Sequence, residues 1–124
     1  GEGIHGGIGP KGYGDLDGDG DMDIVRGNIW YENTDGKGGS WRAHEDLIPA
    51  GGNRPDKYGL ALKSWVIDLD GDEDLDIIEA EADTPNGRVF WFENRKHAKK
   101  WRYHVISQEE TGQDFHSLAV ADFD

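Results

Sequence analysis

A run of aspartates and glycines near the start of the chain decides how the rest of it folds. This stretch reads Asp15-Leu16-Asp17-Gly18-Asp19-Gly20-Asp21-Met22-Asp23-Ile24-Val25. Its aspartates occupy alternating positions, so their carboxylates would repel one another strongly unless a cation lay among them. Ca²⁺ takes roughly six to eight oxygen ligands, and acidic loops with aspartate at positions 1, 3, 5 and 9 supply them. The stretch therefore predicts a metal-binding loop, followed by a strand that begins at Ile24-Val25.

Each aspartate of this loop has an expected role. Four of them fit the positions from which side chains bind the ion: Asp15, Asp17, Asp19 and Asp23. Asp21 stands at position 7, where the backbone carbonyl would be the ligand. Gly18 and Gly20 would let the loop curl, because glycine tolerates positive φ.

The same frame occurs again later in the chain. The second copy reads Asp68-Leu69-Asp70-Gly71-Asp72-Glu73-Asp74-Leu75-Asp76-Ile77-Ile78. A third copy begins at Asp122-Phe123-Asp124, where the sequence stops. A single acidic run is usually solvated surface. Two complete copies in one frame, each followed by paired β-branched residues, favour metal binding over an acidic turn.

Charge and composition narrow the possible partners and the location. The chain has 124 residues and a formal net charge of −13, and half of its acids lie in the three acidic stretches. Such a chain is a poor candidate for binding nucleic acid or anionic membranes. No stretch approaches the ~20 apolar residues of a membrane-spanning helix. Calcium loops of modest affinity suit the calcium concentrations outside cells, which favours an extracellular or secreted protein.

A second repeated pattern sets the fold class. Trp30-Tyr31-Glu32-Asn33 matches Trp91-Phe92-Glu93-Asn94, and Trp41-Arg42-Ala43-His44 matches Trp101-Arg102-Tyr103-His104. Nineteen glycines and five tryptophans also indicate tight turns and aromatic strands. Each unit of roughly 55 residues then holds four short strands, a period typical of propeller blades. We therefore expect an all-β fold of antiparallel four-stranded β-propeller blades.

The expected blades and strands can be placed along the sequence. One blade would cover residues 1–57, the next residues 58–114, and a third would start at residues 115–124. The expected strands are a broken strand within 1–14, then 23–26, 28–33, 41–48, 58–67, 76–80, 88–94, 101–106 and 115–121. About two blades are too few for a closed propeller, which needs at least four. The expected partners are therefore further blades, from the same longer chain or from other copies.

These motifs resemble the FG-GAP/VCBS repeat family. The resemblance is carried by the two acidic loops, by Trp-Tyr/Phe-Glu-Asn, and by the run His116-Ser117-Leu118-Ala119-Val120-Ala121-Asp122-Phe123-Asp124. Members of the family are seven- or eight-bladed β-propellers, including integrin α-subunit heads and many secreted bacterial proteins. The resemblance implies Ca²⁺ in the loop that joins the first two strands of each blade. In the second loop it implies the ligands Asp68, Asp70, Asp72, Asp76 and the carbonyl of Asp74, while Asp122 and Asp124 would begin a third site.

An EF-hand is the alternative calcium site. Its loop needs glycine at position 6 and glutamate at position 12. The first copy has Gly20 at position 6 but Arg26 at position 12, whereas the second has Glu79 at position 12 but Glu73 at position 6. Neither copy is flanked by a helical pattern, so the EF-hand is disfavoured. Glu73 is expected to strain the second loop and to weaken its site.

Other residues could carry chemistry, although a structural role is favoured for most of them. His44 and His104 recur at matching repeat positions, while His5 and His116 precede acidic stretches and could line a shared surface. A second acidic cluster, formed by Glu79, Glu81 and Asp83, is expected to be a solvated hairpin rather than a general acid–base pair. Core packing is expected for the repeated tryptophans Trp30, Trp41, Trp91 and Trp101. Trp65 has no counterpart and is expected in a buried strand rather than stacked on a sugar.

The function expected from the sequence is binding rather than catalysis. The chain has no metalloprotease helix motif, nucleophile elbow, paired-cysteine motif or phosphate loop. A calcium-stabilised module that binds a protein or carbohydrate ligand is favoured. The alternative is a fragment of a propeller enzyme acting on sugars, because some propellers of similar sequence are polysaccharide lyases or sugar dehydratases.

Overall fold

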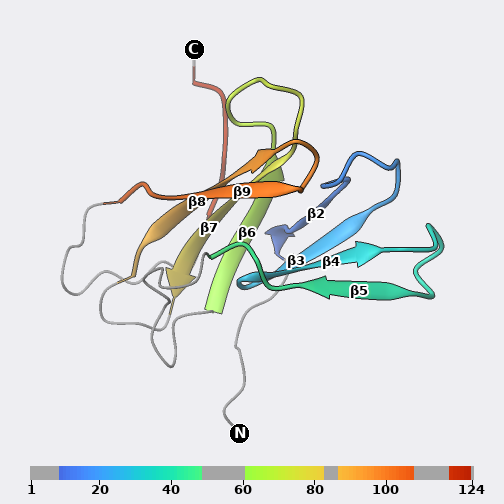
Figure 1. The fold of residues 1–124 in the computed structure, drawn as a ribbon. Coiled ribbons are helices and arrows are strands. Elements are labelled where there is room, and N and C mark those ends of the chain that lie inside the picture. Colours follow the sequence, from blue (N-terminus) through green and yellow to red (C-terminus); the bar gives the residue numbers. More distant parts are fainter. Residues whose placement is uncertain (1–8, 49–60, 83–86, 108–117, 124) are drawn as a thin grey trace, which may run out of the picture.

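The chain folds into two β-sheets that pack against each other (Figure 1). The computed structural model describes residues 9–48, 61–82, 87–107 and 118–123. These residues contain nine strands and no helix, which confirms the predicted all-β class. In the same part of the chain, no helix is therefore long and apolar enough to cross a membrane.

The first sheet is an antiparallel meander in the order β2-β3-β4-β5. Its strands are β2 (Tyr13–Gly14), β3 (Asp23–Arg26), β4 (Ile29–Asn33) and β5 (Trp41–His44). The first acidic loop joins β2 to β3. Gly27 has φ 63° in the tight turn between β3 and β4, a conformation that glycine adopts at little cost.

The second sheet has the order β1-β6-β7-β8-β9. Its strands are β1 (Pro10–Lys11), β6 (Ala61–Ile67), β7 (Asp76–Ala82), β8 (Val89–Arg95) and β9 (Lys100–Val105). Strands β6 to β9 form an antiparallel meander like the first sheet, and the second acidic loop joins β6 to β7. Strand β1 runs parallel to β6, so the chain changes sheet between Lys11 and Tyr13.

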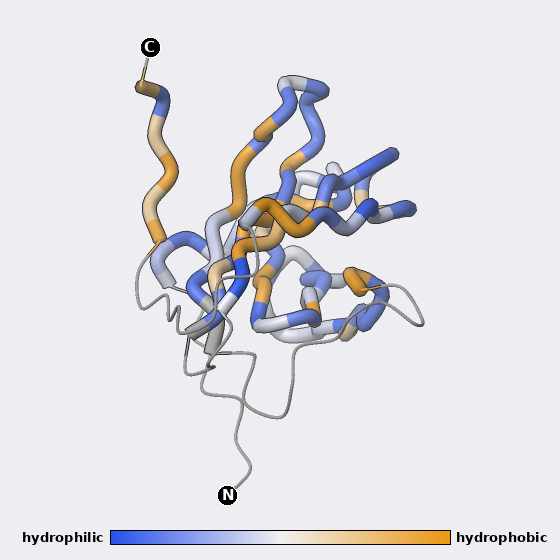
Figure 2. Tube along the Cα trace, turned by 90° about the vertical axis from the view of Figure 1, so that its left-hand side faces the viewer, coloured by the Kyte–Doolittle hydropathy of each residue, from blue (hydrophilic) through white to orange (hydrophobic). Residues whose placement is uncertain are grey.

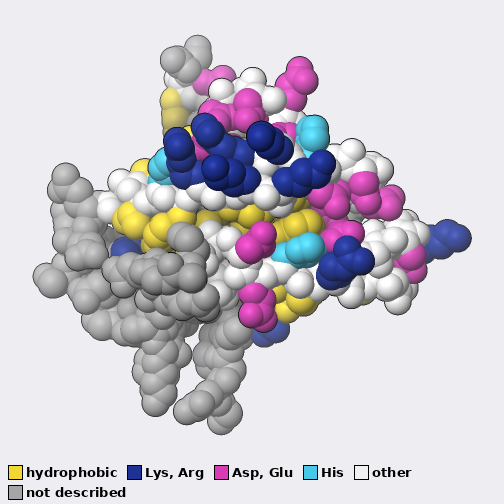
Figure 3. All heavy atoms as spheres, in the orientation of Figure 1, with side chains coloured by type: hydrophobic (Ala, Val, Ile, Leu, Met, Phe, Trp, Pro, Cys, Tyr) yellow, Lys and Arg dark blue, Asp and Glu magenta, His cyan; other side chains and the backbone are white. Residues whose placement is uncertain are grey.

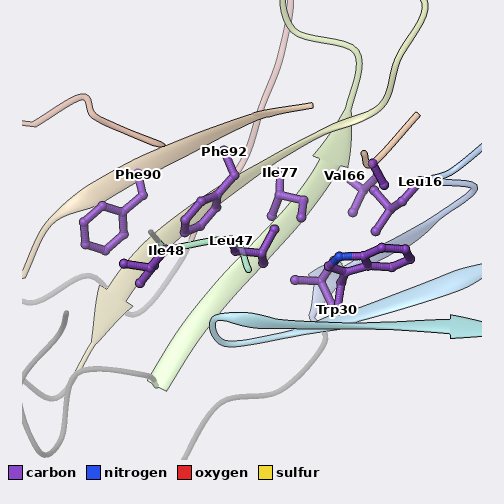
Figure 4. Packing of buried hydrophobic residues seen from close by; sticks show 10 residues of the cluster. Leu16, Trp30, Leu47, Ile48, Val66, Ile77, Phe90 and Phe92 are labelled. Atoms are coloured by element: carbon purple, nitrogen blue, oxygen red, sulfur yellow. The ribbon is translucent and has the colours of Figure 1, made fainter. Parts of the chain in front are cut away.

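One hydrophobic core lies between the two sheets. Strand residues alternate in burial, as in β8, where Phe90 and Phe92 are buried and Trp91 is half-buried. Figure 4 shows side chains of the two sheets facing one another, and the core comprises Leu16, Val25, Trp30, Leu47, Ile48, Val66, Ile77, Phe90, Phe92 and Ala98. Figure 2 shows hydrophilic turns at the ends of these strands. The acidic loops are therefore held at the edge of a packed core.

Two predictions at β5 are wrong, one on the extent of the strand and one on the burial of Trp41. The strand expected over residues 41–48 ends at His44, and Leu47 and Ile48 leave the sheet to enter the core. Trp41, expected in the core, has 41% of its surface exposed. It lies on an edge strand, and its indole nitrogen donates to the carbonyl of Gly38 at 2.9 Å. Trp30 is buried, whereas Trp65, Trp91 and Trp101 are half-buried.

The strand expected over residues 115–121 is not formed in the part that the structure describes. Residues 118–123 belong to no strand and extend away from the two sheets in Figure 2. A strand requires a neighbouring chain that accepts and donates ladder hydrogen bonds, and no sheet partner pairs with these residues. Predictions on His5, Asp83, His116 and Asp124 fall outside the described residues.

Candidate metal centre

The first acidic loop is folded by its own carboxylates. The two oxygens of Asp15 accept hydrogen bonds from the backbone amides of Gly18 and Gly20, at 2.8 and 2.9 Å. Asp17 and Asp19 each accept from the amide two residues later, at 3.3 and 2.9 Å. Each aspartate at positions 1, 3 and 5 therefore helps to turn the backbone around the loop.

The second loop repeats every one of these hydrogen bonds. Asp68 accepts from the amides of Gly71 and Glu73, at 2.7 and 3.1 Å. Asp70 and Asp72 accept from the amides two residues later, at 3.3 and 3.0 Å. Glu73 takes the left-handed backbone conformation that the frame requires, with φ 75°, where Gly20 has φ 97°. The predicted strain at Glu73 is confirmed, because side-chain-bearing residues reach this region only at a cost.

The last aspartate of each loop is buried. It is the first residue of a strand, and it ties the loop to the neighbouring strand that follows in the chain. Asp23 accepts from the second residue of its own loop at 2.9 Å and from the amide of Asn33 at 3.0 Å. Asp76 makes the equivalent two contacts. It accepts from the amide of the second residue of its own loop at 3.0 Å and from the amide of Asn94 at 2.7 Å. Burial raises the pKa of both carboxyls, and nearby loop carboxylates raise it further, whereas the amide bonds lower it. A cation among the carboxylates would oppose these two unfavourable effects.

Three carboxylates come together in each loop. One oxygen from each lies within 4.8 Å of the others in two groups, Asp15 with Asp17 and Asp19, and Asp68 with Asp70 and Asp76. The predicted ligands Asp23 and Asp72 belong to the same hydrogen-bonded frames but not to these groups. Each carboxylate oxygen has two lone pairs, so accepting an amide bond leaves room for a cation. Oxygen-only donors of this kind fit a hard cation such as Ca²⁺.

The aspartates at position 7 lie against neighbouring turns. A Cβ atom added to Gly36, in the loop between β4 and β5, would lie 2.5 Å from an Asp21 carboxylate oxygen. Asp74 contacts His97, in the turn between β8 and β9, with 2.6 Å from its carboxylate to the ring Nδ1 and 3.3 Å to the backbone amide. The Asp74 carboxylate is therefore engaged with His97, and the Asp21 carboxylate lies close to Gly36. Ligation by the backbone carbonyls of Asp21 and Asp74 stays a prediction.

Of the two aspartates expected to begin a third site, only Asp122 lies in the described part of the chain. Asp122 is exposed and belongs to neither carboxylate group, and Asp124 lies outside the described residues. A third site stays a prediction.

Three residues that hold the two loops were not singled out from the sequence. Asn33 and Asn94 were noted only as parts of a repeated motif, yet their amides close the loops on the buried aspartates. His97 lies three residues after Asn94, in a turn where Lys96, His97 and Ala98 all have positive φ, between 55° and 59°. The Glu-Asn repeat could have indicated the asparagines. No repeat signal marks His97.

A cluster of positive charge lies next to the acidic loops. Figure 3 shows lysine and arginine side chains gathered over β9, with acidic side chains around them. The exposed cations of the β8–β9 hairpin are Arg95, Lys96, Lys99, Lys100 and Arg102. The tip of this hairpin also meets the first loop, because a Cβ atom on Gly18 would lie 3.0 Å from His97 Nδ1. These cations offset part of the negative charge of the loops.

The repeated histidines have structural partners. His44 stacks on Trp30 with 4.0 Å between ring centroids, and its Nε2 lies 2.7 Å from Glu32. The same three residue types meet in the second unit as His104, Trp91 and Glu93, with 4.5 Å between rings and 2.7 Å to the carboxylate. The hydrogen bond with His104 lowers the pKa of Glu93. These contacts support the structural role expected for both histidines.

The second acidic cluster is buried, so the expectation of a solvated hairpin is wrong for its described residues. Glu81 forms a two-pronged ion pair with Arg88, at 3.0 and 3.2 Å. Glu79 accepts from Ser64 Oγ at 2.9 Å, and burial raises its pKa to about 8. The other oxygen of Glu79 has no hydrogen-bond partner in the part of the chain that the structure describes. The cause is the length of β7, which carries both glutamates along the core face beyond Ile77.

Comparison of the chain with protein-family models, with curated proteins and with solved structures finds no match.

Proposed function

We propose that this chain is an extracellular calcium-binding β-propeller module of the FG-GAP/VCBS type, which binds a protein or carbohydrate ligand. The observation that carries the proposal is the hydrogen-bonded frame that the two acidic loops share. The same frame, built twice from aspartates at the same spacing, gathers three carboxylates in each loop. A cation bound among the three carboxylates would offset the repulsion that this arrangement creates.

Ca²⁺ suits the loops better than Mg²⁺ does. Ca²⁺ accepts a variable number of oxygen ligands in flexible geometry, whereas Mg²⁺ demands a nearly ideal octahedron. In the first loop Asp15, Asp17 and Asp19 would hold the ion, with Asp23 and the carbonyl of Asp21 completing the set. In the second loop Asp68, Asp70 and Asp76 would do so, with Asp72 and the carbonyl of Asp74. The bound ion would supply positive charge that permits the carboxylates to remain together.

The arrangement of the sheets supports the propeller. Propeller blades are four-stranded antiparallel sheets that pack face to face around an axis. Strands β2 to β5 and β6 to β9 are two consecutive meanders of this kind, and they share one core. A closed ring needs more blades, which the same longer polypeptide or other copies would provide. Ligands of such a module would meet exposed groups such as the Trp41 ring and the cations over β9, because tryptophan and arginine are frequent in interfaces.

Calorimetry of the chain after removal of metal with EGTA tests the proposal. Addition of Ca²⁺ should release heat, saturate and raise the melting temperature, and Mg²⁺ should compete only weakly. A stripped, folded chain that shows neither heat nor a change in melting temperature would remove the proposal.

A fragment of a sugar-acting propeller enzyme is the second candidate. The observation in its favour is Glu79, because buried acids with raised pKa values occur often at functional sites. A lyase acting on an acidic polysaccharide creates an unsaturated sugar that absorbs ultraviolet light. We expect no such signal from the chain. A signal that disappears in Glu79→Gln would favour the enzyme instead.

A further inference from the structure

The side chain of Asn94 lies between the two acidic loops. Its Nδ2 donates to the carbonyl oxygen of Leu16 in the first loop at 2.7 Å, and to that of Leu75 in the second loop at 3.0 Å. A primary amide has two N–H donors, so one donor is available to each loop. The side chain is almost fully buried, with 1% of the residue exposed.

Both contacts reach backbone next to carboxylates that would hold the metal. Leu16 stands between Asp15 and Asp17, two members of the first carboxylate group. Leu75 precedes Asp76, which belongs to the second group and accepts from the Asn94 backbone amide at 2.7 Å. One residue therefore fixes a carbonyl in each loop and a carboxylate in the second.

The orientation of the Asn94 amide is fixed from a third direction. Its Oδ1 accepts from the backbone amide of Ala98 at 2.6 Å, across the turn that leads into β9. In the same turn His97 contacts the Asp74 carboxylate and lies against Gly18. The turn therefore touches both loops and prevents the amide from rotating away from either carbonyl.

We infer that Asn94 couples the two loops, so that binding of a cation in one loop strengthens binding in the other. The inference rests on the proposed metal binding. A cation in the first loop fixes Asp15 and Asp17, and with them the Leu16 carbonyl that holds the Asn94 amide. The ordered amide then fixes Leu75 and Asp76, so the second loop loses less conformational freedom when its own cation binds. The reverse holds equally, because coupling between two sites is reciprocal.

Two Ca²⁺ ions also repel each other, which acts in the opposite direction. At a physiological ionic strength of about 0.15 M, charges on exposed loops are screened over about 8 Å. The experiments should therefore be done at this ionic strength, which weakens the repulsion between the two sites.

Calorimetry on four chains tests the coupling. Asp17→Ala removes the first site, and the Ca²⁺ affinity of the second loop is then compared with that in the parent chain. We expect a loss of about five-fold or more. In an Asn94→Ala background, Asp17→Ala should change that affinity by less than about two-fold. Alanine keeps the backbone amide bonded to Asp76, while the side-chain contacts with Leu16, Leu75 and Ala98 are lost.

Asn33→Ala is the matched control. Asn33 occupies the same repeat position, and its side-chain oxygen accepts from Gly38 in its own unit, at 3.0 Å. In this background Asp17→Ala should still weaken the second loop as it does in the parent chain. Equal loss in the Asn33→Ala and Asn94→Ala backgrounds would overturn the coupling.

Hydrogen exchange gives a second test that leaves Asn94 in place. In Asp70→Ala, Ca²⁺ can bind only the first loop, and its addition should slow exchange of the Asn94 and Ala98 amides. Unchanged exchange, with Ca²⁺ bound, would overturn the coupling alone. A parent chain that takes up no Ca²⁺ would overturn the proposed function and the coupling with it.

Discussion

The two units are alike at one end and different at the other. At the loop end, the hydrogen bonds that Asp15 and Asp68 accept and the buried contacts of Asp23 and Asp76 match one by one. At the far end, β7 and β8 are seven residues long, whereas their counterparts β3 and β4 have four and five. The shared part of the structure is therefore the part that the acidic frame organises.

The extra length of the second unit carries buried charge. Glu79 follows Asp76 by the same interval as Arg26 follows Asp23. Arg26 is exposed at the end of β3, whereas Glu79 lies inside β7 and is fully buried. The spacing of aspartates therefore fixes the loop end, while strand length decides which charges the far end must bury.

Asp76→Ala should have the largest effect on stability. It leaves two backbone amides without their acceptor, which costs roughly 2–5 kcal/mol. Asp72→Ala is the control, because Asp72 is exposed and accepts a single amide bond. Removing either carboxylate relieves repulsion of the same kind, so the difference isolates the buried contacts. Urea unfolding in the presence of EGTA measures the loss of stability in each variant. Equal losses in Asp76→Ala and Asp72→Ala would show that the buried aspartate does not organise the loop.

Glu79→Gln should change how stability depends on pH. Burial raises the pKa of Glu79 from 4.5 to about 8, so the unfolded chain releases this proton at lower pH than the folded chain does. The folded state therefore holds the extra proton between these values, and stability falls with rising pH by about 1.4 kcal/mol per unit. The stability that comes from the raised pKa of Glu79 is fully present below pH 4.5 and is lost as pH rises through about 8.

Urea unfolding at several pH values between 5 and 8 checks this prediction. The difference in stability between Glu79→Gln and the parent chain should grow steadily in favour of glutamine. Arg26→Gln, at the equivalent position of the first unit, should leave the pH dependence unchanged. Parallel curves for Glu79→Gln and the parent would mean that Glu79 is charged in the folded chain.

Glu73→Gly should make the second loop more like the first, with a small gain. The left-handed conformation of Glu73 costs about 1 kcal/mol, which glycine avoids, although glycine loses part of this gain in the unfolded state. The reciprocal change, Gly20→Ala, should lose a similar amount for conformational reasons alone, because a Cβ atom there would meet nothing within 4 Å. Thermal melting measures both. A loss of stability in Glu73→Gly would show that the side chain makes a contact that matters more than the strain.

The sequence predicted the loop end well, for a physical reason. Alternating aspartates and glycines restrict the backbone locally, so the frames of residues 15–23 and 68–76 follow from spacing alone. The all-β class followed from the repeated Trp-Tyr/Phe-Glu-Asn motif and the many turn residues.

Contacts between distant segments could not be predicted in the same way. The burial of Glu79 depends on the length of β7 and on what packs over it, and neither leaves a local pattern. The bridge from Asn94 to Leu16 spans 78 residues and joins the two units, so no repeat within one unit could indicate it. Trp41 shows the reverse error, since a matched repeat position predicted burial where the edge of the sheet leaves the ring exposed.

The count of Ca²⁺ ions per chain tests the central claim most directly. Native mass spectrometry of the EGTA-stripped chain, titrated with Ca²⁺, should show two ions bound, one for each acidic loop. Asp17→Ala and Asp70→Ala should each bind one ion, and the double variant should bind none. A folded parent chain that binds no Ca²⁺, or single variants that still bind two ions, would contradict the account.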